Sequence, residues 1–145
     1  MPPSPKPAAA QDRRAVRDLA PDDRPNAWLL GAAGWLVPGA AHALQGQTQK
    51  AIVFFVTLLA MFAIGIAFGG RLFPLQPSDP LVFLEALAEW MLGLPRIVAG
   101  TAGYGRGDVV GAAYEYGNTF LIVSGLLNAL VLLDAMDLAT GRKPR

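Results

Sequence analysis

Two carboxylates and one guanidinium in the middle of the chain are the first candidates for chemistry. Glu85 and Glu89 are four residues apart, which places both carboxylates on one face of a helix, and Arg96 follows seven residues later. Buried in an apolar medium, such a set could relay protons or bind an ion. The alternative, which the spacing favours, is the solvated face of an interfacial helix.

His42 is the only histidine in the sequence. A lone imidazole could supply one axial ligand to haem or chlorophyll. It cannot build a zinc or di-iron site by itself, because the chain has no second histidine and no cysteine. We favour a structural role, in which His42 lies beside Pro38 and bonds a freed carbonyl or a lipid headgroup.

No other catalytic constellation can be assembled from the sequence. Nothing places Ser4, Ser78 or Ser124 near the single histidine, so a Ser/His/Asp set cannot be proposed. The glycine-rich stretch at 103–107 has neither a preceding strand nor a following Lys-Ser pair, so a phosphate loop is poorly supported. The basic N-terminal tail lacks interleaved aromatic residues, which argues against a nucleic-acid partner. We therefore expect a protein that is not an enzyme.

Small and polar residues form a stripe near the C-terminus. Small residues let helices in a membrane approach closely, and an amide at such an interface contributes about 0.6 kcal/mol on average. A small-xxx-small pair at Gly65 and Gly69 could receive this stripe. We expect a packing role rather than a pore lining, because no charged residue accompanies the amide within its span. The stripe comprises Gly117, Ser124, Gly125 and Asn128.

The elements that must position these residues are strongly apolar. Hydrophobic residues make up 53% of the 145 residues and charged residues 16%, whereas soluble domains carry about 25% charged residues. Runs without a formal charge cover 25–49, 51–70 and 116–133. About 20 apolar residues in a helix cross a bilayer core, and backbone within lipid must satisfy its own hydrogen bonds. The sequence predicts an all-α, polytopic integral membrane protein with three to four hydrophobic helices.

The predicted organisation is a helical membrane domain over residues 27–138 between two polar tails. The tails are a flexible, Pro/Arg-rich segment over 1–26 and a basic segment over 139–145. Pro38 should kink the first apolar segment or make it turn back, and the helix predicted over 80–94 is short enough to be interfacial or re-entrant. The glycine-rich stretch from 100 to 117 is expected to be a loop. The predicted helices lie at about 27–45, 50–70, 80–94 and 116–138.

The distribution of lysine and arginine predicts the orientation in a bacterial inner membrane, because these residues favour the cytoplasmic side. If the first segment turns back, or if four segments cross, nine basic residues share a side with both termini and three lie opposite. If three segments cross, the ratio is eight to four. We therefore expect both termini in the cytoplasm. A secretory signal over Trp28–Val37 with a cleavage site near Ala43 is the less favoured alternative.

The stretch around Pro38 resembles the hairpin of small bacterial membrane proteins with a P-G-x-G-H-x-x-x-G signature, relatives of the two-transmembrane-helix domain family. Ala41 departs from the second glycine of that pattern and Leu44 from its usual tyrosine. The resemblance implies a helical hairpin and does not imply any particular activity. The residues that match the pattern are Pro38, Gly39, His42 and Gly46.

We expect a non-catalytic scaffold or accessory subunit that packs against a larger membrane protein complex or a second copy, in contact with the lipid bilayer. The packing surface would be the stripe that contains Asn128, helped by the proline-rich tail. One alternative is a small transporter or channel subunit that uses Glu85, Glu89 and Arg96. Another is a subunit that binds haem or chlorophyll through His42; neither cofactor is favoured.

Overall fold

The computed structural model describes residues 26–142, and the helices within this range account for most of it. No β-strand occurs among these residues; a single antiparallel bridge joins Arg71 and Arg106. The predicted tail over 1–25, including its flexibility, and the basic residues at 143–145 lie outside the described part. The helices are α2 (Ala27–Leu36), α3 (Ala40–Leu44), α4 (Thr48–Ala67), α5 (Pro80–Trp90), α6 (Leu94–Thr101) and α7 (Tyr114–Ala139).

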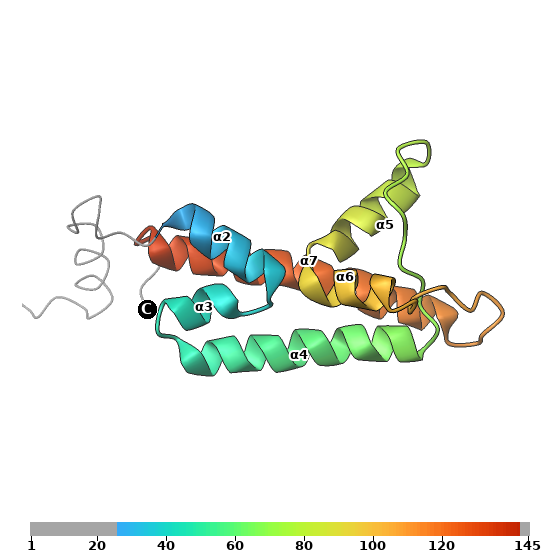
Figure 1. Ribbon diagram of the computed structural model, residues 1–145, viewed down its shortest axis with the longest axis horizontal. Helices are drawn as coiled ribbons and strands as arrows, with labels where there is room; N and C mark the ends of the chain where they lie inside the picture. The colour runs from blue at the N-terminus through green and yellow to red at the C-terminus, as the bar shows by residue number, and fades with distance from the viewer. Residues whose placement is uncertain (1–25, 143–145) are drawn as a thin grey trace, which may run out of the picture.

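Two long helices, α4 and α7, run antiparallel along the length of the molecule (Figure 1). Both are long and apolar enough to cross a membrane. Within the most apolar 18-residue stretch of each helix, only 22% of α4 and 28% of α7 is buried in the protein. A core helix of a soluble protein would be mostly buried, so the two helices present their apolar sides outward.

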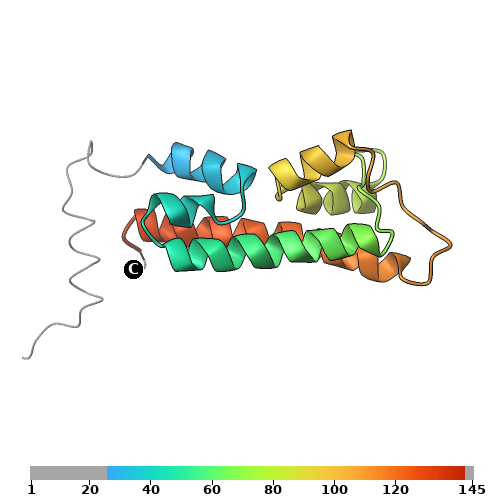
Figure 2. The same ribbon diagram turned by 60° about the horizontal axis from the view of Figure 1, so that its bottom comes forward.

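The first apolar segment does not cross as one helix but doubles back. α2 runs to the middle of α7, the chain turns at Val37–Gly39, and α3 returns to the end where α2 began (Figures 1 and 2). The physical cause is Pro38, which has no N–H and cannot continue a helix. Gly39 completes the turn with a φ of 80°, a conformation that glycine adopts without strain.

A second helical hairpin, α5 and α6, approaches from the opposite end (Figure 2). Asp79 caps the start of α5, since its carboxylate accepts hydrogen bonds from the amides of Leu81 and Val82. The sequence placed one helix over 80–94 and a loop from 100. The structure instead ends α5 at Trp90, turns through residues 91–93 and starts α6 at Leu94.

Several leucine side chains are exposed in this fold, while several polar side chains are buried. On α5 the side chains of Leu81, Leu84 and Leu87 are 71%, 60% and 44% exposed, whereas Glu89 is 1% exposed. On α7, Leu130 is 61% exposed, while the small and polar residues of the stripe face inward. Exposed leucine beside a buried glutamate departs from the usual burial of these residue types in soluble proteins.

Candidate functional site

The two hairpins meet at the middle of α7, around the side chain of Asn128. Its Nδ2 donates hydrogen bonds to the carbonyl oxygens of Gly34, at 3.1 Å, and Met91, at 2.7 Å. In a continuous helix these carbonyls would accept from the N–H four residues later, and those residues are Pro38 and Pro95. Asn128 therefore supplies the donor that both prolines lack. We call this meeting point the hairpin junction.

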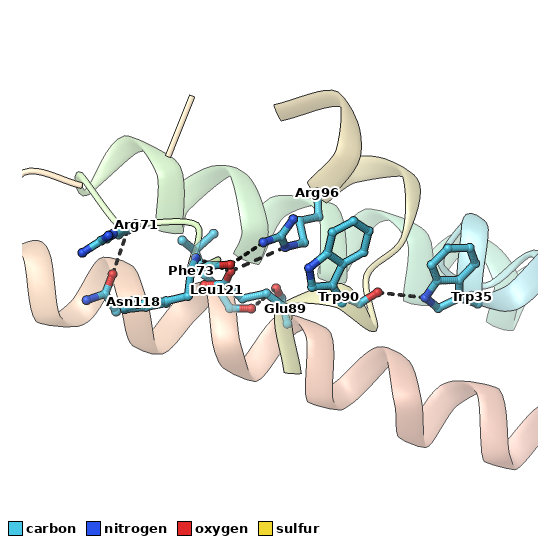
Figure 3. Close-up of polar contacts among 9 residues, drawn as sticks. Trp35, Arg71, Phe73, Glu89, Trp90, Arg96, Asn118 and Leu121 are labelled. Atoms are coloured by element: carbon cyan, nitrogen blue, oxygen red, sulfur yellow. Dashed lines mark hydrogen bonds and ion pairs between the residues drawn. The ribbon is translucent and has the colours of Figure 1, made fainter. Parts of the chain in front are cut away.

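A second contact joins the hairpins directly. The indole Nε1 of Trp35, near the end of α2, donates to the carbonyl oxygen of Trp90, the last residue of α5, across 2.8 Å (Figure 3). Gly93 follows in the turn with a φ of 59°, and a Cβ built there would overlap the Trp35 carbonyl oxygen. The backbones of the two hairpins thus touch at a position that only glycine can occupy.

Glu89 and Arg96 hold the segment after α4 against the second hairpin (Figure 3). Oε2 of Glu89 accepts from the Phe73 amide at 2.9 Å, and a guanidinium nitrogen of Arg96 donates to the Phe73 carbonyl at 2.5 Å. The two charged side chains lie 3.7 Å apart, and Arg96 stacks over the Trp90 ring at 4.3 Å. Together they clamp both polar groups of one residue's backbone, here called the Phe73 clamp.

The clamp corrects the expectation that Glu85 and Glu89 form a solvated face. Glu89 and Arg96 are both buried, whereas Glu85 lies one turn away at a partly exposed position. Burial raises the pKa of Glu89 above its ordinary value, while the Phe73 amide and the Arg96 charge act in the opposite direction. Burial likewise lowers the pKa of Arg96. Of the three candidate residues Glu85, Glu89 and Arg96, the structure brings Glu89 and Arg96 together around the backbone of Phe73.

His42 is fully buried, and its Nε2 lies 3.0 Å from Oδ2 of Asp134 on α7. Its ring also meets the edge of Phe54 on α4. The expected contact with a carbonyl freed by Pro38 is therefore wrong, since Asn128 makes that contact. A haem or chlorophyll would have to displace Asp134 or reach Nδ1 inside the packed hairpin, and the geometry gives that alternative no support. Among the described residues, no group of His, Cys, Asp and Glu could hold a metal ion.

The stripe on α7 packs within the chain itself. A Cβ on Gly117 would lie 2.7 Å from the Gly70 amide, and one on Gly65 would lie 2.8 Å from the Leu121 side chain. Gly125 lies against the Ala88 carbonyl of α5 so closely that a Cβ there would overlap it. Ser124 is buried and donates to the Leu121 carbonyl. The stripe thus contacts α2, α4 and α5.

Gly69 differs from its expected place. It lies beyond Ala67, where α4 ends, and has a φ of 78°, so it is a turn residue rather than part of a helical stripe. A Cβ there would approach Asp108 at 3.0 Å. Of the hairpin residues, Gly46 occupies the turn between α3 and α4 with a φ of 77° and open space around it.

Sequence reasoning missed several partners. Asp134 meets His42, and the partly exposed Asp137 pairs with Arg142 at 3.7 Å. Trp35 and Phe73 were not singled out at all. One signal was available: two prolines inside apolar stretches each free a carbonyl, and a buried amide in another helix can satisfy such groups.

The fold and the junction define a helical protein with two candidate membrane-spanning helices and two helical hairpins that meet between their ends. Residues 29–144 match a family model, DUF6677, a family of unknown function, and the chain belongs to this family. No curated protein and no solved structure matches the chain. The family match tests neither the P-G-x-G-H-x-x-x-G resemblance nor the link to the two-transmembrane-helix domain family, and both stay predictions.

Proposed function

We propose that this protein is a non-catalytic scaffold or accessory subunit embedded in the bacterial inner membrane. The observation that carries the proposal is the burial pattern: leucines such as Leu84 on α5 and Leu130 on α7 face outward, while Glu89, Arg96 and Asn128 are inside. In water, these exposed side chains would favour aggregation; in lipid, they are solvated by the acyl chains. Two spanning helices and two hairpins that enter from opposite sides fit this medium.

The buried polar groups support a structural role over transport. The amide of Asn128 is bonded to two hairpin carbonyls, and Glu89 and Arg96 are bonded to the Phe73 backbone. A transport site needs polar groups that a substrate can reach, whereas these three residues are 1%, 1% and 8% exposed. The transporter remains the alternative; proton flux in liposomes that Glu89→Gln abolishes would favour it.

The surface for a partner must differ from the one that the sequence suggested, because the stripe on α7 is covered by the chain's own helices. The outward trough between α2 and α7 is better suited. It is lined by apolar residues, with Trp28 87% exposed, and a Cβ on Gly31 would meet no atom within 4 Å. Small residues in such a trough allow a helix of another subunit to approach closely.

The proposal is tested by purification in mild detergent and mass spectrometry of the chains that co-migrate. We expect an associated membrane protein or a second copy with the native chain, and loss of it with Gly31→Leu, which fills the trough without touching the fold. Ala60→Leu, at an exposed position on α4, serves as the matched control. Recovery of the native chain only as a monomer contradicts the scaffold, and recovery from the soluble fraction contradicts the membrane location.

A further inference from the structure

An apolar cavity of about 450 Å³ lies between α4 and α6, on the outside of the bundle. Its walls include Phe55 and Ala63 of α4 and Leu94 of α6, and it ends at Tyr104 just beyond α6. We call it the α4–α6 groove. It belongs neither to the hairpin junction nor to the Phe73 clamp, and it does not involve the trough beside α2.

The groove is the right length for a lipid acyl chain and too short for a transmembrane helix. Along α4 it extends from Phe55 to Ile66, which is about 16 Å at 1.5 Å per residue. A bilayer core is about 30 Å thick, so the groove covers one leaflet. A transmembrane helix of a partner needs about 20 residues and would extend well beyond the groove, whereas one acyl chain of a phospholipid fills half of the core.

The outer end of the groove carries a positive charge. The Arg106 guanidinium lies 3.4 Å from where a Cβ on Gly103 would be, and Gly103 directly precedes Tyr104, which is 63% exposed. In the part of the chain that the structure describes, no ion pair involves Arg106. An apolar channel that ends at an unpaired guanidinium and a phenol is complementary to an acyl chain that ends at an anionic phosphate.

We propose that the α4–α6 groove binds one acyl chain of an anionic phospholipid and that Arg106 holds its phosphate. The inference rests on the membrane location proposed above and adds a specific lipid site to it. The site is confined to the leaflet at the end of the bundle opposite the first residue of α2 (Figure 1). Tyr104 lies at headgroup level, where amphipathic rings are favoured.

The experiment is native mass spectrometry of the delipidated full chain, titrated with phosphatidylglycerol or phosphatidylcholine. Ala63→Trp fills the groove, and Ala60→Trp, at an exposed position three residues earlier on α4 and outside the groove, is the matched control. We expect about tenfold weaker binding of phosphatidylglycerol to Ala63→Trp and native binding to Ala60→Trp. Ala102→Trp, on the opposite wall, should reproduce the loss if Ala63→Trp fails to fold.

The headgroup is tested separately with Arg106→Gln. We expect about fivefold weaker binding of phosphatidylglycerol and unchanged binding of phosphatidylcholine. Equal lipid binding by Ala63→Trp and Ala60→Trp overturns the inference. It is also overturned if Ala63→Trp keeps its bound lipid and instead loses a protein partner or a second copy of the chain. Flotation with vesicles separates the lipid site from the membrane location. A chain that floats with the vesicles but binds no lipid in the groove overturns the lipid site alone. A chain that does not float overturns both the lipid site and the membrane location.

Discussion

The Asn128 side chain donates a hydrogen bond of 2.7 Å to the carbonyl oxygen of Met91, which the absent N–H of Pro95 leaves without a helical donor. The same amide bonds the Gly34 carbonyl, left free by Pro38 in the other hairpin. One side chain on α7 thus compensates two breaks that are 57 residues apart in the sequence. The junction thus gives a donor to two carbonyls between the packed helices, where an unpaired carbonyl would cost free energy.

Replacement of this amide should loosen both hairpins at once. We expect Asn128→Leu, which keeps the volume and removes the donor, to lower the free energy of unfolding by about 1–3 kcal/mol. The measurement is unfolding in mixed detergent micelles with increasing SDS. Leu130→Ala, at a position 61% exposed on the same helix, is the control and should change the midpoint little. A native midpoint for Asn128→Leu would contradict the role given to the junction.

The Trp35 indole provides a second, independent link between the hairpins. Trp35→Phe keeps the aromatic ring and removes the donor to the Trp90 carbonyl. We expect destabilisation by about 0.6–2 kcal/mol, the range for hydrogen bonds between membrane helices. Trp28→Phe changes a ring that is 87% exposed and should have no effect on the same SDS titration. Equal midpoints for the two variants would show that the indole bond adds nothing to stability.

Close approach of α5 and α7 predicts a strong effect of one methyl group. Gly125→Ala places a Cβ into the Ala88 carbonyl, so the helices must move apart at a cost of about 1–3 kcal/mol or more. Gly31→Ala adds the same methyl group to a helix where no atom lies within 4 Å. This control should be neutral or slightly stabilising, because alanine favours helix over glycine. Thermal unfolding of both variants in one detergent tests the contrast.

The Phe73 clamp should behave as a unit. Glu89→Leu leaves the Phe73 amide and a buried Arg96 without their partner, and Arg96→Met leaves a buried carboxylate. Removal of one member of a buried pair destabilises by about 3–5 kcal/mol. The double variant should be less destabilised than the sum of the two, since it buries no unpaired charge. Additive effects in the SDS titration would mean that the two side chains act separately.

The orientation can be tested cleanly because the chain has no cysteine. Gln49→Cys lies at the end of the bundle where both described chain ends lie, and Val110→Cys lies in the loop before α7, at a site 91% exposed (Figure 1). With the termini in the cytoplasm, a membrane-impermeant maleimide should label Val110→Cys in spheroplasts and Gln49→Cys only after permeabilisation. The reverse pattern would place the termini outside.

The sequence by itself predicted a helical protein and the two stretches, now α4 and α7, that are apolar enough to cross a membrane. Such properties are local: an uncharged run of 20 residues is apolar whatever surrounds it, and Pro38 ends a helix in any fold. The helix predicted at about 50–70 follows in the same way, and the structure has it at Thr48–Ala67. The all-helical expectation is confirmed for residues 26–142.

The tertiary structure alone decided which faces are inside and which residues meet. Whether Glu89 is solvated or buried depends on Phe73, 16 residues earlier, and on how α5 tilts against α7. The partner of His42 lies 92 residues away, and the two carbonyls bonded by Asn128 belong to different hairpins. Periodicity defines the faces of a helix but not the neighbour of each face, because that depends on contacts between segments distant in the chain.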